Sequence, residues 1–160
     1  MNESSGKQAL TASGLPSVHA LLRDGATEQP DVVMTAQEKK KMAEAFIAAI
    51  RSRDRQLFES ILAEDVVWSL PGTSLVSGDA LGVDGIIKRA ESLAQRRVNI
   101  EIQHVVFGLS DMGLLLHNTG EHGGRKLDEH LTTILQLRGR KIHRLDTYIS
   151  DVEMLNRYFA

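Results

Sequence analysis

Glu129 is the first residue in this sequence whose type and surroundings suggest chemistry. It lies in residues 127–137, where every leucine has the same parity, so a strand there would have one apolar face that includes Glu129. Burial among leucines raises the pKa of a carboxyl group, which suits a general acid or base. We therefore predict that Glu129 is a catalytic acid or base. The alternative, a solvent-exposed glutamate at the rim of a pocket, fits the same pattern and stays open.

His104 is the second catalytic candidate. It shares the parity of Ile100, Ile102 and Val106, which predicts a strand with all four side chains on one apolar face. A histidine that faces a bound ligand can carry protons to and from it. A core histidine with a backbone hydrogen-bond partner fits the same position.

Residues 127–149 are predicted to form a β-hairpin, and the length of its turn decides which side chains face inward. A two-residue turn at positions 139–140 would bury Arg144 and Asp146, and burying unpaired charges is costly. We therefore predict a three-residue turn at positions 138–140, which points Asp146, the third candidate acid, away from the pocket. With His143 opposite Leu135, the predicted ligand-binding residues of this inner face are Leu131, Thr133, His143, Leu145 and Thr147.

Other predicted pocket residues come from earlier in the chain. Trp68, the sole tryptophan, either packs structurally or stacks on a flat ligand. Asn118 is expected opposite Glu129, where it would orient that carboxyl group or a carbonyl group of the substrate. The remaining predicted lining residues are apolar: Phe46, Leu70 and Leu116.

A second set of polar residues is expected on the outer face of the sheet. His117 and His130 become neighbours across two strands if residues 123–124 form a two-residue turn, and Asp128 would lie close by. Two histidines and a carboxylate can hold a metal ion. A dimer interface or a wet surface fits the same residues, and we predict no metal site and no cofactor.

The helices and strands expected from the sequence, which must position these residues, predict an α+β fold. Thr35 and Glu38 form a capping box that begins a helix over residues 36–52, and Asp54 caps a second, shorter helix. A glycine-rich loop then leads into a third helix. The other predicted elements are a strand at residues 66–68, successive strands from residue 98 onward, and a helix over residues 151–159. The expected architecture is a cone: a curled antiparallel or mixed sheet wrapped around three N-terminal helices, with a short C-terminal helix.

Length and composition set limits on the function. The chain has 160 residues, 42% of them hydrophobic, which is enough for one core. A net charge of -2 gives no basic surface for nucleic acid or membrane, and without cysteine there is no disulfide or thiolate metal site. We expect a cytoplasmic homodimer that joins through the outer sheet face near Ile134 and Tyr148. Residues 1–34 are expected to form a flexible extension before a domain at residues 35–160.

Three strings of sequence, in this order, are similar to one known group of proteins. They are the strand entry at residues 62–68, the Pro71-Gly72 to Ile86 stretch with Gly78 and Gly82, and the ending at residues 139–151. Together they resemble the SnoaL-like branch of the nuclear-transport-factor-2-like superfamily, from Thr35 to Ala160. The resemblance implies a hydrophobic pocket protein, typically a cofactor-free acid–base enzyme such as an isomerase, epoxide hydrolase, dehydratase or polyketide cyclase. It also includes non-catalytic ligand-binding and dimerisation modules.

The catalytic residues of two of these enzyme types are missing. The resemblance places the acidic and basic groups of ketosteroid isomerases at Phe46, Leu70 and Thr133, which lack that chemistry. It places the epoxide hydrolase relay near Leu114, Leu116 and Thr147, which also cannot supply it. The acid of SnoaL-type cyclases falls where Asp146 or Thr147 lies. The resemblance thus implies cyclisation, dehydration, isomerisation or hydration of a hydrophobic polyketide- or terpenoid-like substrate, with the non-catalytic module as the alternative.

Overall fold

The computed structural model describes residues 33–160, so residues 1–32 of the expected extension lie outside the described residues. Met34, which the sequence analysis assigned to that extension, is buried in the core. The elements occur in this order: α1 (Ala36–Ser52), α2 (Arg55–Ile61), β1 (Leu62–Leu70), β2 (Gly78–Leu81), α3 (Gly82–Gln95), β3 (Asn99–Phe107), β4 (Met112–His122), β5 (Arg125–Arg138), β6 (Lys141–Ile149) and α4 (Val152–Tyr158).

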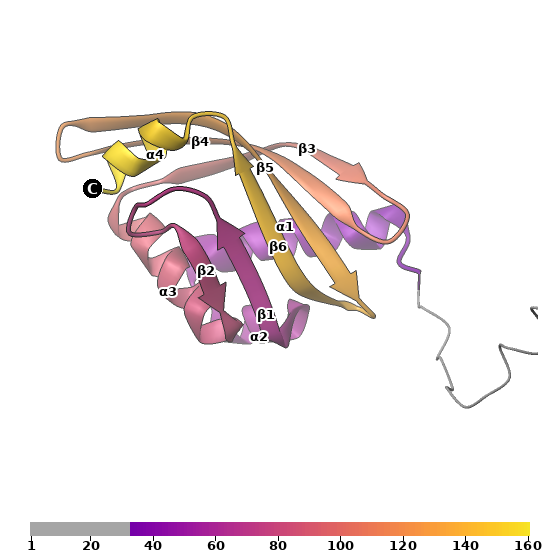
Figure 1. Cartoon of the computed structure of the whole chain (residues 1–160). Coiled ribbons are helices and arrows are strands. Elements are labelled where there is room, and N and C mark those ends of the chain that lie inside the picture. The colour runs from indigo at the N-terminus through magenta and orange to yellow at the C-terminus, as the bar shows by residue number, and fades with distance from the viewer. Residues whose placement is uncertain (1–32) are drawn as a thin grey trace, which may run out of the picture. The chain divides into compact units, whose positions relative to one another are not determined.

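The six strands form one mixed sheet in the order β2-β1-β6-β5-β4-β3. All neighbouring pairs are antiparallel except β1 and β6, which run parallel. The sheet bends over α1 and α3, and α4 packs near the far end of the β4–β5 hairpin (Figure 1). This arrangement confirms the predicted α+β cone, in which the inner sheet face and the helices enclose the core.

Local capping explains where the helices begin. The Thr35 side chain accepts a hydrogen bond from the backbone of Glu38, and the Glu38 carboxylate accepts one from the backbone of Thr35, so the predicted capping box is present. Asp54 accepts hydrogen bonds from the backbone of Gln56 and Leu57 at the start of α2. Asp151 caps α4 in the same way.

None of the helices among residues 33–160 is both long and apolar enough to cross a membrane.

The predicted three-residue turn between β5 and β6 is wrong, although the predicted inner face is largely right. Arg138 pairs with Lys141, so the turn has two residues, and the pairing register then shifts between Gln136 and Leu137. This shift leaves His143 as an extra residue in β6, a β-bulge. The bulge restores the apolar parity, so a short turn and a buried Leu145 occur together without burying two charges.

A second bulge, in β3, puts His104 on a different face of the sheet from the one predicted. The β3–β4 register shifts between Ile102 and His104, so the alternation predicted for β3 breaks after Ile102. His104 is exposed, whereas Val105 is half-buried and packs against the core. The prediction that His104 lies on the apolar inner face is therefore wrong, because one inserted residue moves every later side chain to the other face.

Candidate acid–base site

A small cavity lies between the inner face of the sheet and the helices α1, α3 and α4. Its volume is about 30 Å³, which is room for one or two water molecules. The predicted pocket residues that line it are Phe46, Trp68, Leu70, Leu116, Asn118, Glu129, Leu131 and Thr133. Glu129 is the one ionisable side chain in this lining. The structure thus brings most of the predicted residues together, and their role in binding stays a prediction.

Glu129 is buried in the wall of this cavity. The residue is 2% exposed, and its Oε2 atom has no hydrogen-bond partner among the described residues. Burial raises the pKa of this carboxyl group from 4.5 to about 7, although the Asn118 side chain lowers it and the charge of Asp151 raises it slightly further. A carboxyl group with this pKa exists in both protonation states at neutral pH, so it can donate or accept a proton.

Asn118 lies directly opposite Glu129 in the β4–β5 register, as predicted. It is also buried, and its Oδ1 atom lacks a hydrogen-bond partner within residues 33–160. An unpaired buried polar atom costs roughly 1–3 kcal/mol, so the two orphaned oxygens together are a marked departure from a satisfied core. They make one wall of the cavity polar and leave two acceptors free for a bound molecule that can donate.

Two residues of the cavity lining, Trp68 and Thr133, are joined by hydrogen bonds through Thr147 behind them. Trp68 Nε1 donates to Thr147 Oγ1 at 2.9 Å, and Thr147 Oγ1 lies 2.9 Å from Thr133 Oγ1. The contact between the two threonines uses only one of their two hydroxyl hydrogens, so the other remains to donate elsewhere. Because Thr133 lines the cavity, this arrangement can offer a hydrogen bond to an oxygen atom of a ligand.

Arg89 is a residue of this region that the sequence analysis did not single out. It is buried on α3, donates to Trp68 O at 2.6 Å and to Gly78 O at 2.8 Å, and its guanidinium group lies over the Trp68 ring, 4.9 Å from the centroid. Burial lowers the pKa of its guanidinium group to about 10, so it stays charged at neutral pH. The helical spacing of Arg89 relative to Ile86 and Leu93, which puts all three on the face of α3 toward the core, could have predicted its burial.

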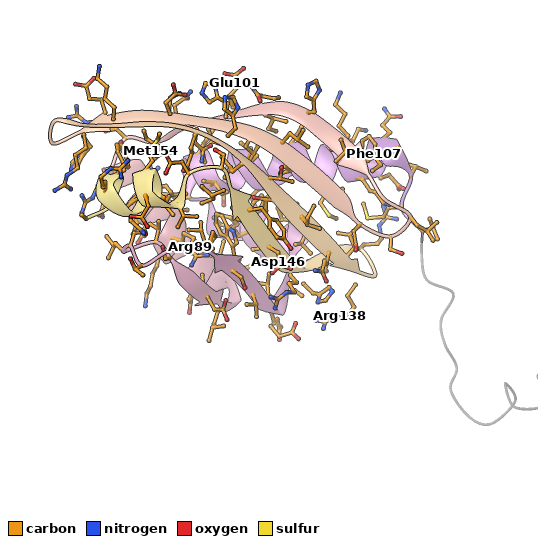
Figure 2. The ribbon with its side chains drawn as sticks, turned by 45° about the horizontal axis from the view of Figure 1, so that its top comes forward. Arg89, Glu101, Phe107, Arg138, Asp146 and Met154 are labelled. Carbon is orange, nitrogen blue, oxygen red and sulfur yellow. The ribbon has the colours of Figure 1, made fainter. Side chains whose placement is uncertain are left out.

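The other predicted site residues lie elsewhere. Exposed His104 and half-buried His143 do not line the cavity. Asp146 lies on the outer side of β6, where Arg144 and Gln136 donate to its carboxylate (Figure 2). Leu145 is fully buried in the core and Thr147 lies behind Trp68 and Thr133, so neither lines the cavity.

Two apolar side chains and one hydrogen bond close the cavity where the β1–β2 connection meets α4. Val76 from the connection and Leu155 from α4 are both buried and both line the cavity. Asn156 Oδ1 accepts a hydrogen bond from the backbone of Thr73 at 2.8 Å. The space beside Gly72 is taken by this Asn156 side chain, so the two segments approach closely.

Comparisons with known proteins match the structure but not the sequence. No protein-family model and no curated protein matches the chain. Among solved structures, Bal32a from a soil-derived mobile gene cassette has a TM-score of 0.73 at 19% identity, covering 78% of this chain and 98% of its own. An NTF2-like protein from Burkholderia xenovorans LB400 has a TM-score of 0.69 at 22% identity, with 79% and 99% covered. TerC, co-crystallised with polyporic acid, has a TM-score of 0.65 at 16% identity, with 76% and 98% covered.

Proposed function

From the nuclear-transport-factor-2-like fold of residues 33–160, we propose that this protein binds a small, mainly apolar molecule with an oxygen function and transfers a proton on it. The observation that carries the proposal is the buried carboxyl group of Glu129, which has an orphaned oxygen and faces a cavity. A buried, unpaired carboxyl group destabilises the fold, so its presence suggests a task. We propose cyclisation, dehydration, isomerisation or hydration of a polyketide- or terpenoid-like substrate, in the manner of SnoaL-like proteins.

In the proposed reaction, each polar group of the cavity has one role. Glu129 takes a proton from the ligand or gives one to it, because both of its protonation states are present near pH 7. Thr133 donates its hydroxyl hydrogen to the ligand oxygen, and Thr147 and Trp68 hold that hydroxyl group in place. Asn118, which lies opposite Glu129 on the neighbouring strand, orients the Glu129 carboxyl group.

The small volume of the cavity requires that it open when a ligand binds. A volume of about 30 Å³ is far below the roughly 300–1,000 Å³ of typical ligand pockets. Val76 and Leu155 are the side chains whose outward movement would enlarge it, since they belong to a connection and a short terminal helix rather than to the sheet. Binding would therefore break the hydrogen bond between Thr73 and Asn156.

A thermal-shift panel of small hydrophobic ketones, alcohols and epoxides tests the proposal. A ligand present at a hundred times its dissociation constant adds about 2.7 kcal/mol of stability, which is a rise of about 5 to 10 °C in Tm for a chain of this length. Trp68 fluorescence should change with the same compounds, because its ring lines the cavity. Failure of every compound to change either Tm or the emission of Trp68 would contradict a binding cavity.

The Glu129→Gln variant separates an acid–base site from a carrier. Each protein is compared with its own ligand-free melt, and turnover of the bound compound is followed by chromatography. We expect Glu129→Gln to keep ligand-induced shifts but to lose turnover, since glutamine keeps the size of the side chain and cannot exchange the proton. Equal turnover in both proteins would exclude Glu129 as the acid or base, and binding without turnover in either would indicate a non-catalytic ligand-binding module.

We also propose that the protein is a homodimer through the outer sheet face. Tyr148 is 64% exposed there and borders an open groove of about 490 Å³ whose walls include Leu115 and Ile149. Val106, an exposed apolar residue of the edge strand β3, lies on this outer face too, since it pairs with Gly113, which is opposite Ile134. Exposed apolar groups gathered on one face suggest an interaction surface.

Tyr148→Arg is expected to convert the dimer to a monomer, because it places a charge in the middle of the proposed interface. Sedimentation velocity at micromolar concentration measures the change. Leu81→Arg is the matched control, since Leu81 is equally exposed but lies on β2, the edge strand at the other end of the sheet from β3. A wild-type monomer at this concentration would refute the interface.

A further inference from the structure

Three side chains that can ligate a metal ion gather on the outer face of the sheet. They are His117 on β4 and Asp128 and His130 on β5. His117 Nε2 lies 2.6 Å from Asp128 Oδ1, and the two imidazole rings stack at 4.4 Å between centroids with an angle of 7° between their planes. One ligand atom from each side chain lies within 4.8 Å of the other two.

The β4–β5 turn fixes this geometry. Gly123 and Gly124 both have positive φ angles, of 57° and 75°, as a tight two-residue hairpin turn requires. His122 then pairs with Arg125, and the same register places His117 directly opposite His130. The predicted pairing of His117 with His130 through a two-residue turn at residues 123–124 is therefore confirmed.

The carboxylates of this face add negative charge around the two imidazoles. Asp128 is two residues before His130, so both side chains point to the same side of β5. Glu101 on β3 pairs with His117 from the other side, and its exposed side chain lies away from the helices (Figure 2). Two imidazoles beside carboxylates suit a cation better than an anion or an apolar partner.

We propose that His117, Asp128 and His130 bind a divalent transition-metal ion of the zinc class. Zinc takes imidazole nitrogen and carboxylate oxygen at about 2.0–2.2 Å, so donors this close converge on one ion after small rotations of the side chains. The ion takes the place of the hydrogen between His117 Nε2 and Asp128 Oδ1, that hydrogen moves to Nδ1 of the same ring, and water completes the coordination of the ion. Imidazole ligands favour zinc, nickel or copper over magnesium or calcium.

This site is independent of the proposed acid–base cavity. Glu129 and His130 are adjacent in β5, so their side chains point to opposite faces of the sheet. Because its ligands come from β4 and β5, a bound ion ties the two strands together near the end of their hairpin. The proposed cavity function can therefore fail while the metal site holds, and the reverse is also true.

Zinc titration of the full chain, prepared without a histidine tag and stripped with a chelator, tests the site. Competition with a chromogenic chelator measures the affinity, and we expect one equivalent of zinc per chain. His130→Asn and His117→Asn should each weaken binding at least about tenfold. His104→Asn is the matched control, since His104 is exposed on the neighbouring β3 but lies outside the cluster, and it should leave the affinity unchanged.

Cobalt(II) provides a second readout that does not depend on affinity alone. Bound to two imidazoles and a carboxylate, cobalt gives a visible absorption spectrum, which His130→Asn and Asp128→Asn should remove while His104→Asn keeps it. Zinc-free melts of the variants show that they remain folded, as expected for residues on the surface. Unchanged zinc affinity in both His117→Asn and His130→Asn, or no zinc uptake by the wild-type chain, would overturn the proposal.

Discussion

Glu129→Gln is expected to raise the free energy of unfolding by about 3 kcal/mol at pH 8, although it removes a buried native side chain. In the folded protein, burial raises the pKa of Glu129 from 4.5 to about 7. Each unit of this difference corresponds to about 1.4 kcal/mol, so an ionised Glu129 opposes folding by that amount. Glutamine has the same shape as the protonated acid and carries no charge to bury.

Because the pKa of Glu129 is higher in the folded than in the unfolded state, its effect on stability depends on pH between these two pKa values. The folded state holds the proton more tightly than the unfolded state, so the contribution of protonated Glu129 to stability is fully present below pH 4.5. It is lost as the pH rises from 4.5 to about 7, and the loss is complete above that. The wild type and Glu129→Gln should therefore have nearly equal stabilities at pH 4.5, diverge as the pH rises to about 7, and keep a constant difference up to pH 8.

Urea unfolding at several pH values between 4.5 and 8 measures this divergence. Glu91→Gln, which removes one negative charge from the exposed face of α3, shows how much of the change comes from net charge alone. A Glu129→Gln variant that is less stable than the wild type at pH 8 would mean that the carboxylate has a favourable partner in the fold. A difference that does not vary with pH would show that the carboxyl group does not titrate in this range.

If replacing Glu129 stabilises the protein, that result is also evidence about function. Residues that destabilise a fold are commonly retained for activity, because a prepared site holds groups that the fold alone would not select. The unpaired Oδ1 atom of Asn118, across from Glu129, supports the same conclusion. The prediction thus tests by a stability measurement whether this wall of the cavity departs from ordinary core packing.

Local patterns in the sequence were enough to predict the helices and the face on which Glu129 lies. The capping box at Thr35 and the cap at Asp54 are short-range interactions, so they can be recognised without knowing the fold. The parity of Glu129 relative to Leu127 and Leu131 holds because no bulge interrupts β5 between them and the turn at residues 123–124. The period of the strand predicts which face Glu129 is on, whereas the choice between a buried and a solvent-exposed carboxyl group needed the fold.

The positions of His104 and His143 could not be predicted in the same way. Each was placed by counting alternate residues, and each lies at or next to a bulge where the count shifts by one. No local sequence feature of this chain marks either bulge. The short strand β2 and its pairing with β1 were also missed, because the glycine-rich segment at residues 78–82 is typical of a loop. Long-range pairing determines all three features.

Arg89→Ala is expected to lower the free energy of unfolding by about 4 kcal/mol, the largest effect of any single substitution proposed for this protein. Two buried hydrogen bonds from a charged group, to the carbonyl oxygens of Trp68 and Gly78, contribute roughly 1.5–3 kcal/mol each. The substitution also removes the guanidinium group from the face of the Trp68 ring. Urea unfolding measures the loss, and Trp68 emission reports whether the ring becomes exposed to water.

Two further variants identify the cause of that loss. Arg89→Met keeps most of the side-chain volume but not the donors, so it should recover only the part of the stability that comes from packing. Lys88→Ala removes a neighbouring exposed cation from the same helix and should change stability by less than about 0.5 kcal/mol. If Arg89→Met were as stable as the wild type, the hydrogen bonds to the two carbonyl groups would contribute nothing. Arg89 would then fill space beside Trp68 rather than hold β1 and β2 in place around the cavity.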